Sequence, residues 1–192
     1  KNMKNDIRSI IIKVAQETFR RYGFRKTTMD EIAYAARKGK SSLYYYFKSK
    51  EEVFEAVVEK EINFLHQDII DAVGKAETAK EKINIYIYKR MNGLKNLGNF
   101  YEALKDEYLS NMEFIEKIRK KYDEQEMDIL SKIIGEGIER NEFKMMDATL
   151  TAKIIVIAMK GLEVPLMMEN EKSDIKTRIS EVLDILFYGM CR

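Results

Sequence analysis

The chain has 192 residues, of which 45% are hydrophobic and 34% are charged. This composition is too apolar for a disordered segment and too highly charged for a membrane bundle, which leaves a globular protein of one domain or a small pair of domains. One proline, nine glycines and no tryptophan provide few turn residues, and this shortage indicates long helices.

Charge is unevenly distributed along the chain. Residues 1–50 hold 13 basic and 4 acidic side chains, a net charge of +9, whereas residues 51–192 hold 21 basic and 28 acidic ones, a net charge of −7. This split indicates an amino-terminal part that meets a polyanion, and nucleic acid is the first candidate.

No apolar stretch is long enough to span a membrane, and the single Cys191 gives no support to an oxidising compartment. We therefore expect a cytoplasmic protein.

Three helices are predicted within the first 47 residues. Residues 7–22 carry apolar side chains at helical spacing and predict one amphipathic helix. The segment from Thr28 to Glu31 has the form of a capping box and starts a second helix, and residues 41–47 make a third, short one. Two short helices joined by a glycine-containing turn, and backed by a first helix, are the parts of a helix-turn-helix.

The rest of the chain also has helical spacing. Six further helices are predicted, and they begin near Ser49, Thr78, Phe100, Ser110, Asp147 and residues 173–174. The strict alternation over residues 83–88 is a strand pattern on its own, but its flanks are helix formers and a single strand would have no partner. The expected fold class is therefore all-α, with about nine helices.

The third helix of the helix-turn-helix would enter a DNA groove. Leu43 and Phe47, four residues apart, should face inward and leave five side chains for DNA or solvent: Ser41, Ser42, Tyr44, Tyr45 and Tyr46. Hydroxyl groups exchange hydrogen bonds with phosphates and base edges, and aromatic rings pack on thymine methyl groups. Positive charge surrounds this helix at Lys40, Lys48 and Lys50, and the helix start at Thr28 offers backbone N–H groups to a phosphate.

At these residues the chain resembles the tetracycline-repressor (TetR) family of bacterial transcription regulators. The resemblance rests on the runs Thr27–Ala33 and Leu43–Phe54, with Phe19 and Gly23 at the expected upstream places, and it covers roughly residues 7–58. Beyond residue 58 only the chain length and the helix number agree, which is analogy at the level of the fold. The resemblance implies phosphate contacts for Thr28, Tyr46, Lys48 and Lys50. It implies contacts at or near bases for Lys40, Ser42, Tyr44 and Tyr45, and Ser41 is a looser candidate.

The turn between the second and third helices departs from the family. Where the family usually has Ala-Gly-Val-Ser-Lys-Gly-Thr, this chain has the segment from Ala36 to Ser42, which reads Ala-Arg-Lys-Gly-Lys-Ser-Ser. Arg37 and Lys38 stand where the family has Gly and Val, which adds charge at the groove edge and removes a buried aliphatic side chain. The operator preference of the family therefore cannot be transferred to this chain.

The sequence and the resemblance together divide the chain into two domains. Residues 1–49 would form the helix-turn-helix DNA-binding domain, and residues 50–192 a helical-bundle domain for ligand binding and dimerisation. The middle helices would enclose an inducer pocket lined by Tyr86, Met91, Tyr101, Leu104, Tyr108, Met127, Met159 and Leu162. Core packing is the alternative role for each of these side chains. The last two helices would form a homodimer through Ile154, Ala158, Leu162, Ile179, Leu183, Leu186 and Phe187.

The basic helix-turn-helix and the helical bundle together indicate a function. We expect a ligand-responsive DNA-binding transcription regulator, a repressor that binds a near-palindromic operator as a homodimer and is released by a small-molecule inducer. The alternative is a helical protein-interaction or small-molecule carrier module whose basic head does not read DNA sequence. His66 is the only histidine, Cys191 is the only cysteine, and no pair of acidic residues is selected by its spacing. We therefore expect no enzyme activity, no metal site and no cofactor.

Overall fold

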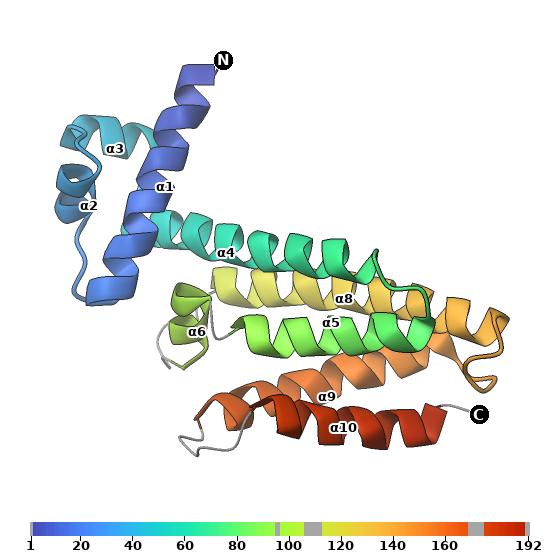
Figure 1. Cartoon of the computed structure of the whole chain (residues 1–192). Coiled ribbons are helices and arrows are strands. Elements are labelled where there is room, and N and C mark those ends of the chain that lie inside the picture. Colours follow the sequence, from blue (N-terminus) through green and yellow to red (C-terminus); the bar gives the residue numbers. More distant parts are fainter. Residues whose placement is uncertain (1, 95–96, 106–112, 169–174, 191–192) are drawn as a thin grey trace. The chain divides into compact units, whose positions relative to one another are not determined.

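The computed structural model describes residues 2–94, 97–105, 113–168 and 175–190. Within these residues the chain forms nine α-helices and no strand (Figure 1). The helices are α1 (Asn2–Tyr22), α2 (Met29–Ala35), α3 (Lys40–Tyr46), α4 (Lys50–Val73), α5 (Ala79–Leu94), α6 (Gly98–Lys105), α8 (Glu113–Glu139), α9 (Ala148–Met168) and α10 (Ile175–Met190). The all-α prediction is confirmed, and residues 83–88 lie inside α5 as expected.

The chain folds into two compact units. The first comprises Lys1–Asn63 and Leu97–Ser110, and the second comprises Phe64–Asn96 and Asn111–Arg192. Helix α4 starts in the first unit and ends in the second. This division follows from how the backbone packs, and the functional boundary after residue 49 stays a prediction.

Helices α1, α2 and α3 pack together in the first unit, where α2 and α3 lie on the same side of α1 (Figure 1). An aromatic cluster joins α1 to α4: the ring of Phe54 lies 5.1 Å from that of Phe19 and 4.9 Å from that of Phe24. The predicted capping box is present at the start of α2. The Glu31 backbone N–H donates to Thr28 Oγ1 at 3.3 Å, and the Thr28 N–H donates to the Glu31 carboxylate at 2.8 Å.

A buried carboxylate joins three helices of the first unit. Glu61 of α4 is only 5% exposed, and Oε2 accepts hydrogen bonds from the backbone N–H groups of Asn99 and Phe100, both at 3.1 Å. Its other oxygen, Oε1, accepts from the side-chain amides of Asn99 at 2.7 Å and Gln16 at 2.9 Å. We call this arrangement the Glu61 clasp. Because Asn99 and Phe100 lie in the first turn of α6, Glu61 satisfies donors that have no partner within the helix.

In the second unit α8 packs against α9, and α5 packs against α8, α9 and α10. The chain reverses tightly after α8. Asn141 adopts a left-handed conformation with φ of 61°, and the Glu142 N–H donates to the Gly137 carbonyl at 2.8 Å. This turn brings Phe143 back onto α8, so close that a Cβ atom on Gly137 would lie 2.3 Å from the phenyl ring. Only glycine fits at residue 137 without a shift of the chain.

A buried ion cluster ties α5, α8 and α9 together in the second unit. Arg90 Nε and Nη2 donate to the two oxygens of Glu126 at 2.8 and 3.4 Å, and Arg90 Nη1 pairs with Glu163. All three residues are buried. Burial by itself disfavours the charged guanidinium, but the two carboxylates outweigh it and hold the pKa of Arg90 above its ordinary value. We call this group the Arg90 network.

Candidate nucleic-acid interface

Helix α3 is anchored by two apolar side chains. Leu43 is completely buried and Phe47, the residue that ends the helix, is almost so, as the sequence predicts for the inward face. Gly39 precedes the helix in an extended conformation and supplies no side-chain cap, although its carbonyl accepts the first helical hydrogen bond from the Leu43 N–H at 3.1 Å. The core contacts of Leu43 and Phe47 therefore fix the orientation of a helix whose own start is weakly capped.

The other faces of α3 carry the predicted contact residues. Tyr44 and Tyr45 are 43% and 63% exposed, Ser41 is exposed, and Ser42 and Tyr46 are half-buried. The rings of Tyr45 and Tyr46 meet edge to face with centroids 5.1 Å apart. The structure thus brings these five side chains together around one short helix.

The cations around α3 differ in how they are held. Lys40 Nζ lies 2.9 Å from Asp30 of α2, and the hydrogen bond and charge of that carboxylate raise the pKa of the lysine. Lys50 Nζ donates to the Phe24 carbonyl at 2.9 Å and lies 4.3 Å from the centre of the Phe24 ring. Lys48 is exposed. Local partners therefore hold two of the predicted phosphate-binding or base-reading lysines.

Thr28 has a structural role beside the predicted one. Its hydroxyl accepts from the Glu31 N–H in the capping box and also donates to the Glu31 carboxylate at 2.9 Å. The side chain is exposed, but its hydrogen-bonding capacity is used within the α2 start. The role of Thr28 as a phosphate contact stays a prediction.

The turn between α2 and α3 has a backbone conformation that was not predicted from the sequence. Arg37 adopts φ of 52°, in the left-handed region. Its backbone N–H donates to the Tyr34 carbonyl and the Lys38 N–H to the Ala33 carbonyl, both at 3.0 Å. This is a Schellman helix end, in which the position of Arg37 is normally glycine. The family usually has glycine at this position, and that glycine could have indicated the left-handed conformation of residue 37.

The predicted inducer-pocket residues fall into three groups. Tyr86, Met91 and Met159 are buried in the second unit, and Met127 and Leu162 are half-buried. The side chains of Tyr101 and Leu104, and the whole of Tyr108, lie outside the described residues. Burial and the carboxylate of Glu126 raise the pKa of the Tyr86 hydroxyl, which has no hydrogen-bond partner among the described residues. The role of the predicted inducer-pocket residues in ligand binding stays a prediction.

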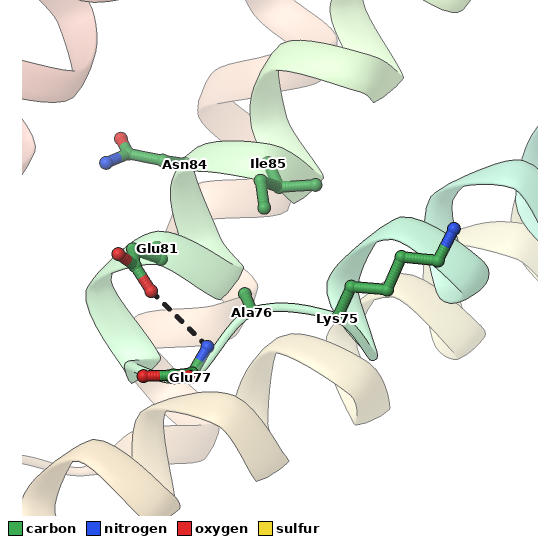
Figure 2. Close-up of a pocket in the computed structure, with 6 residues that line it drawn as sticks. All are labelled: Lys75, Ala76, Glu77, Glu81, Asn84 and Ile85. Carbon is green, nitrogen blue, oxygen red and sulfur yellow. Dashed lines mark hydrogen bonds between the residues drawn. The ribbon is translucent and has the colours of Figure 1, made fainter.

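Pockets in the described part of the chain also lie away from the predicted inducer-pocket residues. Figure 2 shows one of about 480 Å³ where α4 ends and α5 begins, at the surface of the second unit. Six residues line it, namely Lys75, Ala76, Glu77, Glu81, Asn84 and Ile85. The carboxylate of Glu81 accepts a hydrogen bond from the Glu77 N–H at 3.3 Å and closes one wall. None of these residues was predicted to bind a ligand.

The predicted dimer residues divide between core and surface. Ile179, Leu183 and Phe187 of α10 are buried within a single chain, where α10 packs against α5, and the side chain of Leu186 lies outside the described residues. Ile154 and Ala158 of α9 are exposed. Further large apolar side chains are exposed on the same two helices, and these are Leu150, Ile157, Ile185 and Tyr188.

The described part of the chain contains neither a candidate metal site nor a candidate membrane-spanning helix. No group of three or more histidine, cysteine or acidic side chains there is placed to hold a metal ion. None of the described helices has the length and apolar character needed to cross a membrane.

Comparison with known proteins identifies the amino-terminal segment. Residues 11–57 match the bacterial regulatory proteins of the tetR family. The fatty acid metabolism regulator protein of Bacillus subtilis is 26% identical over 185 residues, covering 94% of this chain and 93% of that protein.

Solved structures agree over nearly the whole chain. A transcriptional regulator from Cytophaga hutchinsonii superposes with a TM-score of 0.80 at 27% identity, covering 96% of this chain and 98% of the other. The regulator FadR from Bacillus subtilis, in complex with stearoyl-CoA, gives a TM-score of 0.70 at 26% identity and covers 94% and 98% of the two chains. The helix-turn-helix geometry and the sequence match together show that residues 11–57 belong to the tetR family of bacterial regulatory proteins, and these relatives show that the fold over nearly the whole chain is that of bacterial transcriptional regulators.

Proposed function

We propose that this TetR-family regulator is a repressor that binds a near-palindromic operator as a homodimer, reads DNA with α3 and is released by a small molecule. One observation carries the proposal. Helix α3 buries Leu43 and Phe47 and leaves Tyr44 and Tyr45 exposed beside Ser41 and several lysines. A rigidly held short helix with hydroxyl groups, aromatic rings and nearby cations suits a major groove. A bacterial operator lies in the cytoplasm, so the expected location belongs to the same proposal.

The side chains around α3 would contact two different parts of the DNA, the base edges and the phosphates. Tyr44, Tyr45, Ser42 and Lys40 would lie at or near base edges, because the start and the outward face of a reading helix approach the bases. Positive charge and hydroxyl groups at the edge of the head would contact phosphates, and the proposed residues are Thr28, Tyr46, Lys48 and Lys50. Lys40 would have to exchange Asp30 for DNA, because its ammonium group is paired with that carboxylate in the free protein.

The exposed apolar side chains of α9 and α10 support dimerisation. Ile154, Ile157 and Ala158 lie exposed on α9, and Ile185 and Tyr188 are 76% and 92% exposed on α10. Large apolar side chains left exposed on α9 and α10 favour a protein interface. A two-fold dimer would have to hold its two α3 helices roughly 34–36 Å apart to match one turn of DNA. Light scattering that gave a monomer at micromolar concentration would contradict the dimer.

The inducer would act through the second unit. The relative from Bacillus subtilis was solved with stearoyl-CoA, and Met91, Met159 and Tyr86 provide an apolar interior in this chain. We therefore propose an apolar or acyl-chain metabolite as the class of ligand. By thermodynamic linkage, such a ligand releases DNA only if it binds more tightly to the arrangement that cannot bind DNA.

The DNA claim is tested by fluorescence anisotropy with the gene's own upstream region and a scrambled duplex. Tyr44→Ala should weaken operator binding by about 1–3 kcal/mol, which is roughly 5- to 150-fold in Kd, and should change the sequence preference. The matched control is Tyr88→Ala, which removes an exposed tyrosine from α5 in the second unit and should leave the operator Kd unchanged. Equal binding of the wild type to both duplexes would contradict sequence reading and leave only a basic head.

A further inference from the structure

The turn between α2 and α3 points to a DNA contact that the family pattern does not contain. We propose that Arg37 binds a phosphate of the DNA backbone at the edge of the groove. This inference rests on the proposed function, because it concerns the same DNA-binding head. It adds one residue that was not among the predicted contacts, at a position where the family usually has glycine.

The backbone of Arg37 is held in a conformation that disfavours its side chain. With φ of 52°, its Cβ atom crowds the following carbonyl, which glycine would avoid. Among the described residues only Gly23 and Asn141 also have positive φ, and both are residue types that accept it readily. Arg37 is therefore the exception, and a glycine at residue 37 would fit the turn better.

No local contact explains why arginine occupies this position. The two turn hydrogen bonds near Arg37 are made by backbone atoms, and the side chain is exposed. None of the hydrogen bonds or ion pairs found among the described residues involves its guanidinium group. Backbone strain that the fold does not need is most simply explained by a role of the side chain in binding.

The chemistry of arginine at this place suits a phosphodiester. The turn leads directly into α3, and the start of a reading helix approaches the base edges, so the turn reaches the rim of the groove where phosphates lie. A guanidinium group binds phosphate oxygens in pairs and stays charged at all physiological pH values. Arg37 also differs from Lys40, whose ammonium group is already paired with Asp30 in the free protein.

The test measures operator binding at several salt concentrations for the wild type and for Arg37→Gly. Each phosphate contact contributes a slope of about 0.9 to the fall of log K with log salt concentration. Arg37→Gly should bind both operator and scrambled duplex more weakly, with a slope smaller by about one. The advantage of the wild type over this variant should therefore shrink by roughly three- to fourfold between 50 and 200 mM salt. The Tm of the variant should rise.

Three further variants separate charge from backbone strain. Arg37→Lys should keep the slope of the wild type, because the charge remains. Arg37→Asn removes the charge but tolerates the left-handed conformation, so it should lower the slope even if Arg37→Gly folds differently. Lys132→Gln removes one positive charge from an exposed site on α8 and should leave the slope unchanged.

The outcomes distinguish this inference from the proposed function. A raised Tm with an unchanged salt slope in both Arg37→Gly and Arg37→Asn would overturn the phosphate contact, because a purely structural role changes stability alone. A lowered slope in Arg37→Lys would overturn the role of the charge. Failure of the wild type itself to prefer the operator would instead overturn the proposed function.

Discussion

The Glu61 clasp and the Arg90 network are both buried polar clusters, yet they are satisfied in different ways. In the first unit the donors to the carboxylate of Glu61 among the described residues are all neutral, namely two backbone N–H groups and two side-chain amides. In the second unit Arg90 lies between two carboxylates, those of Glu126 and Glu163. One cluster therefore depends on hydrogen-bond geometry and the other on a balance of charge.

This difference shows what each cluster does for the fold. Glu61 places a negative charge at the start of α6, where the helix dipole and the free N–H groups of Asn99 and Phe100 favour it. It therefore fixes where α6 begins relative to α1 and α4. The Arg90 network instead holds α5, α8 and α9 together only while the guanidinium of Arg90 is present, because a buried unpaired charge is costly.

The largest effect is expected for Arg90→Met. The substitution leaves the buried carboxylate of Glu126 without its cation and Glu163 with only the half-buried Arg119, whose Nη2 lies 3.8 Å from Glu163 Oε2. It should lower the free energy of unfolding by about 3–5 kcal/mol. Urea unfolding followed by circular dichroism measures the change. The control is Lys89→Met on the same helix, which breaks the partly exposed pair with Asp68 and should cost at most about 1 kcal/mol.

A double variant tests whether the lost stability comes from an unpaired buried charge. Adding Glu126→Gln to Arg90→Met removes the carboxylate that Arg90→Met leaves without a cation and should restore part of the lost stability. If Arg90→Met cost no more than Lys89→Met, the Arg90 network would have no role in holding the three helices together.

Glu61→Ala should have a smaller but still large effect. The substitution leaves the buried N–H groups of Asn99 and Phe100 without an acceptor, and we expect a loss of about 2–3 kcal/mol in the free energy of unfolding. Hydrogen exchange of these two amides should become faster, because the first turn of α6 loses its cap. Glu59→Ala, two residues earlier on α4, is the control. Unchanged exchange at Asn99 and Phe100 would show that Glu61 does not cap α6.

Local signals in the sequence predicted the helices well. The capping box at Thr28 is complete, and at Thr78 the Glu81 carboxylate accepts from the Thr78 N–H at 3.2 Å while Thr78 Oγ1 accepts in return. At Ser49, where a helix start was predicted, only half of a capping box forms, because the Glu52 carboxylate accepts from the N–H of Lys48 instead. Caps and apolar spacing act over a few residues, so one sequence is enough to find them.

Contacts between distant residues could not be predicted in the same way. Glu61 and Asn99 are 38 residues apart, and Arg90 and Glu126 are 36 apart. In the sequence each belongs to a helix rich in charged residues, and spacing selects no particular pair among the many acidic and basic side chains. Partner choice depends on tertiary packing, which a helical pattern does not contain.

The same reason explains the mixed list of dimer residues. Apolar spacing on α10 marks side chains that avoid water, but it does not show which of them another helix of the same chain covers. Helix α5 covers Ile179, Leu183 and Phe187, and the large apolar side chains that are exposed among the described ones of α10 are instead Ile185 and Tyr188. On α3, where one face packs on the core and the other meets solvent, the pattern separated Leu43 from Tyr44 correctly.

The smallest effect on stability is expected at the start of α3, which lacks a side-chain acceptor of the kind that Glu61 provides at the start of α6. Gly39 begins α3 without a side-chain cap, where the family usually has serine. Gly39→Ser should raise the free energy of unfolding by a few tenths of a kcal/mol, because the hydroxyl can accept from an N–H in the first turn. The added Cβ atom has room, since its nearest neighbour would be Ser41 Oγ at 4.0 Å. Gly39→Ala restricts the backbone but offers no acceptor, so thermal unfolding of the two variants separates the cap from the backbone effect. An equal Tm for both would mean that the start of α3 gains nothing from a hydroxyl and relies on Leu43 and Phe47 alone.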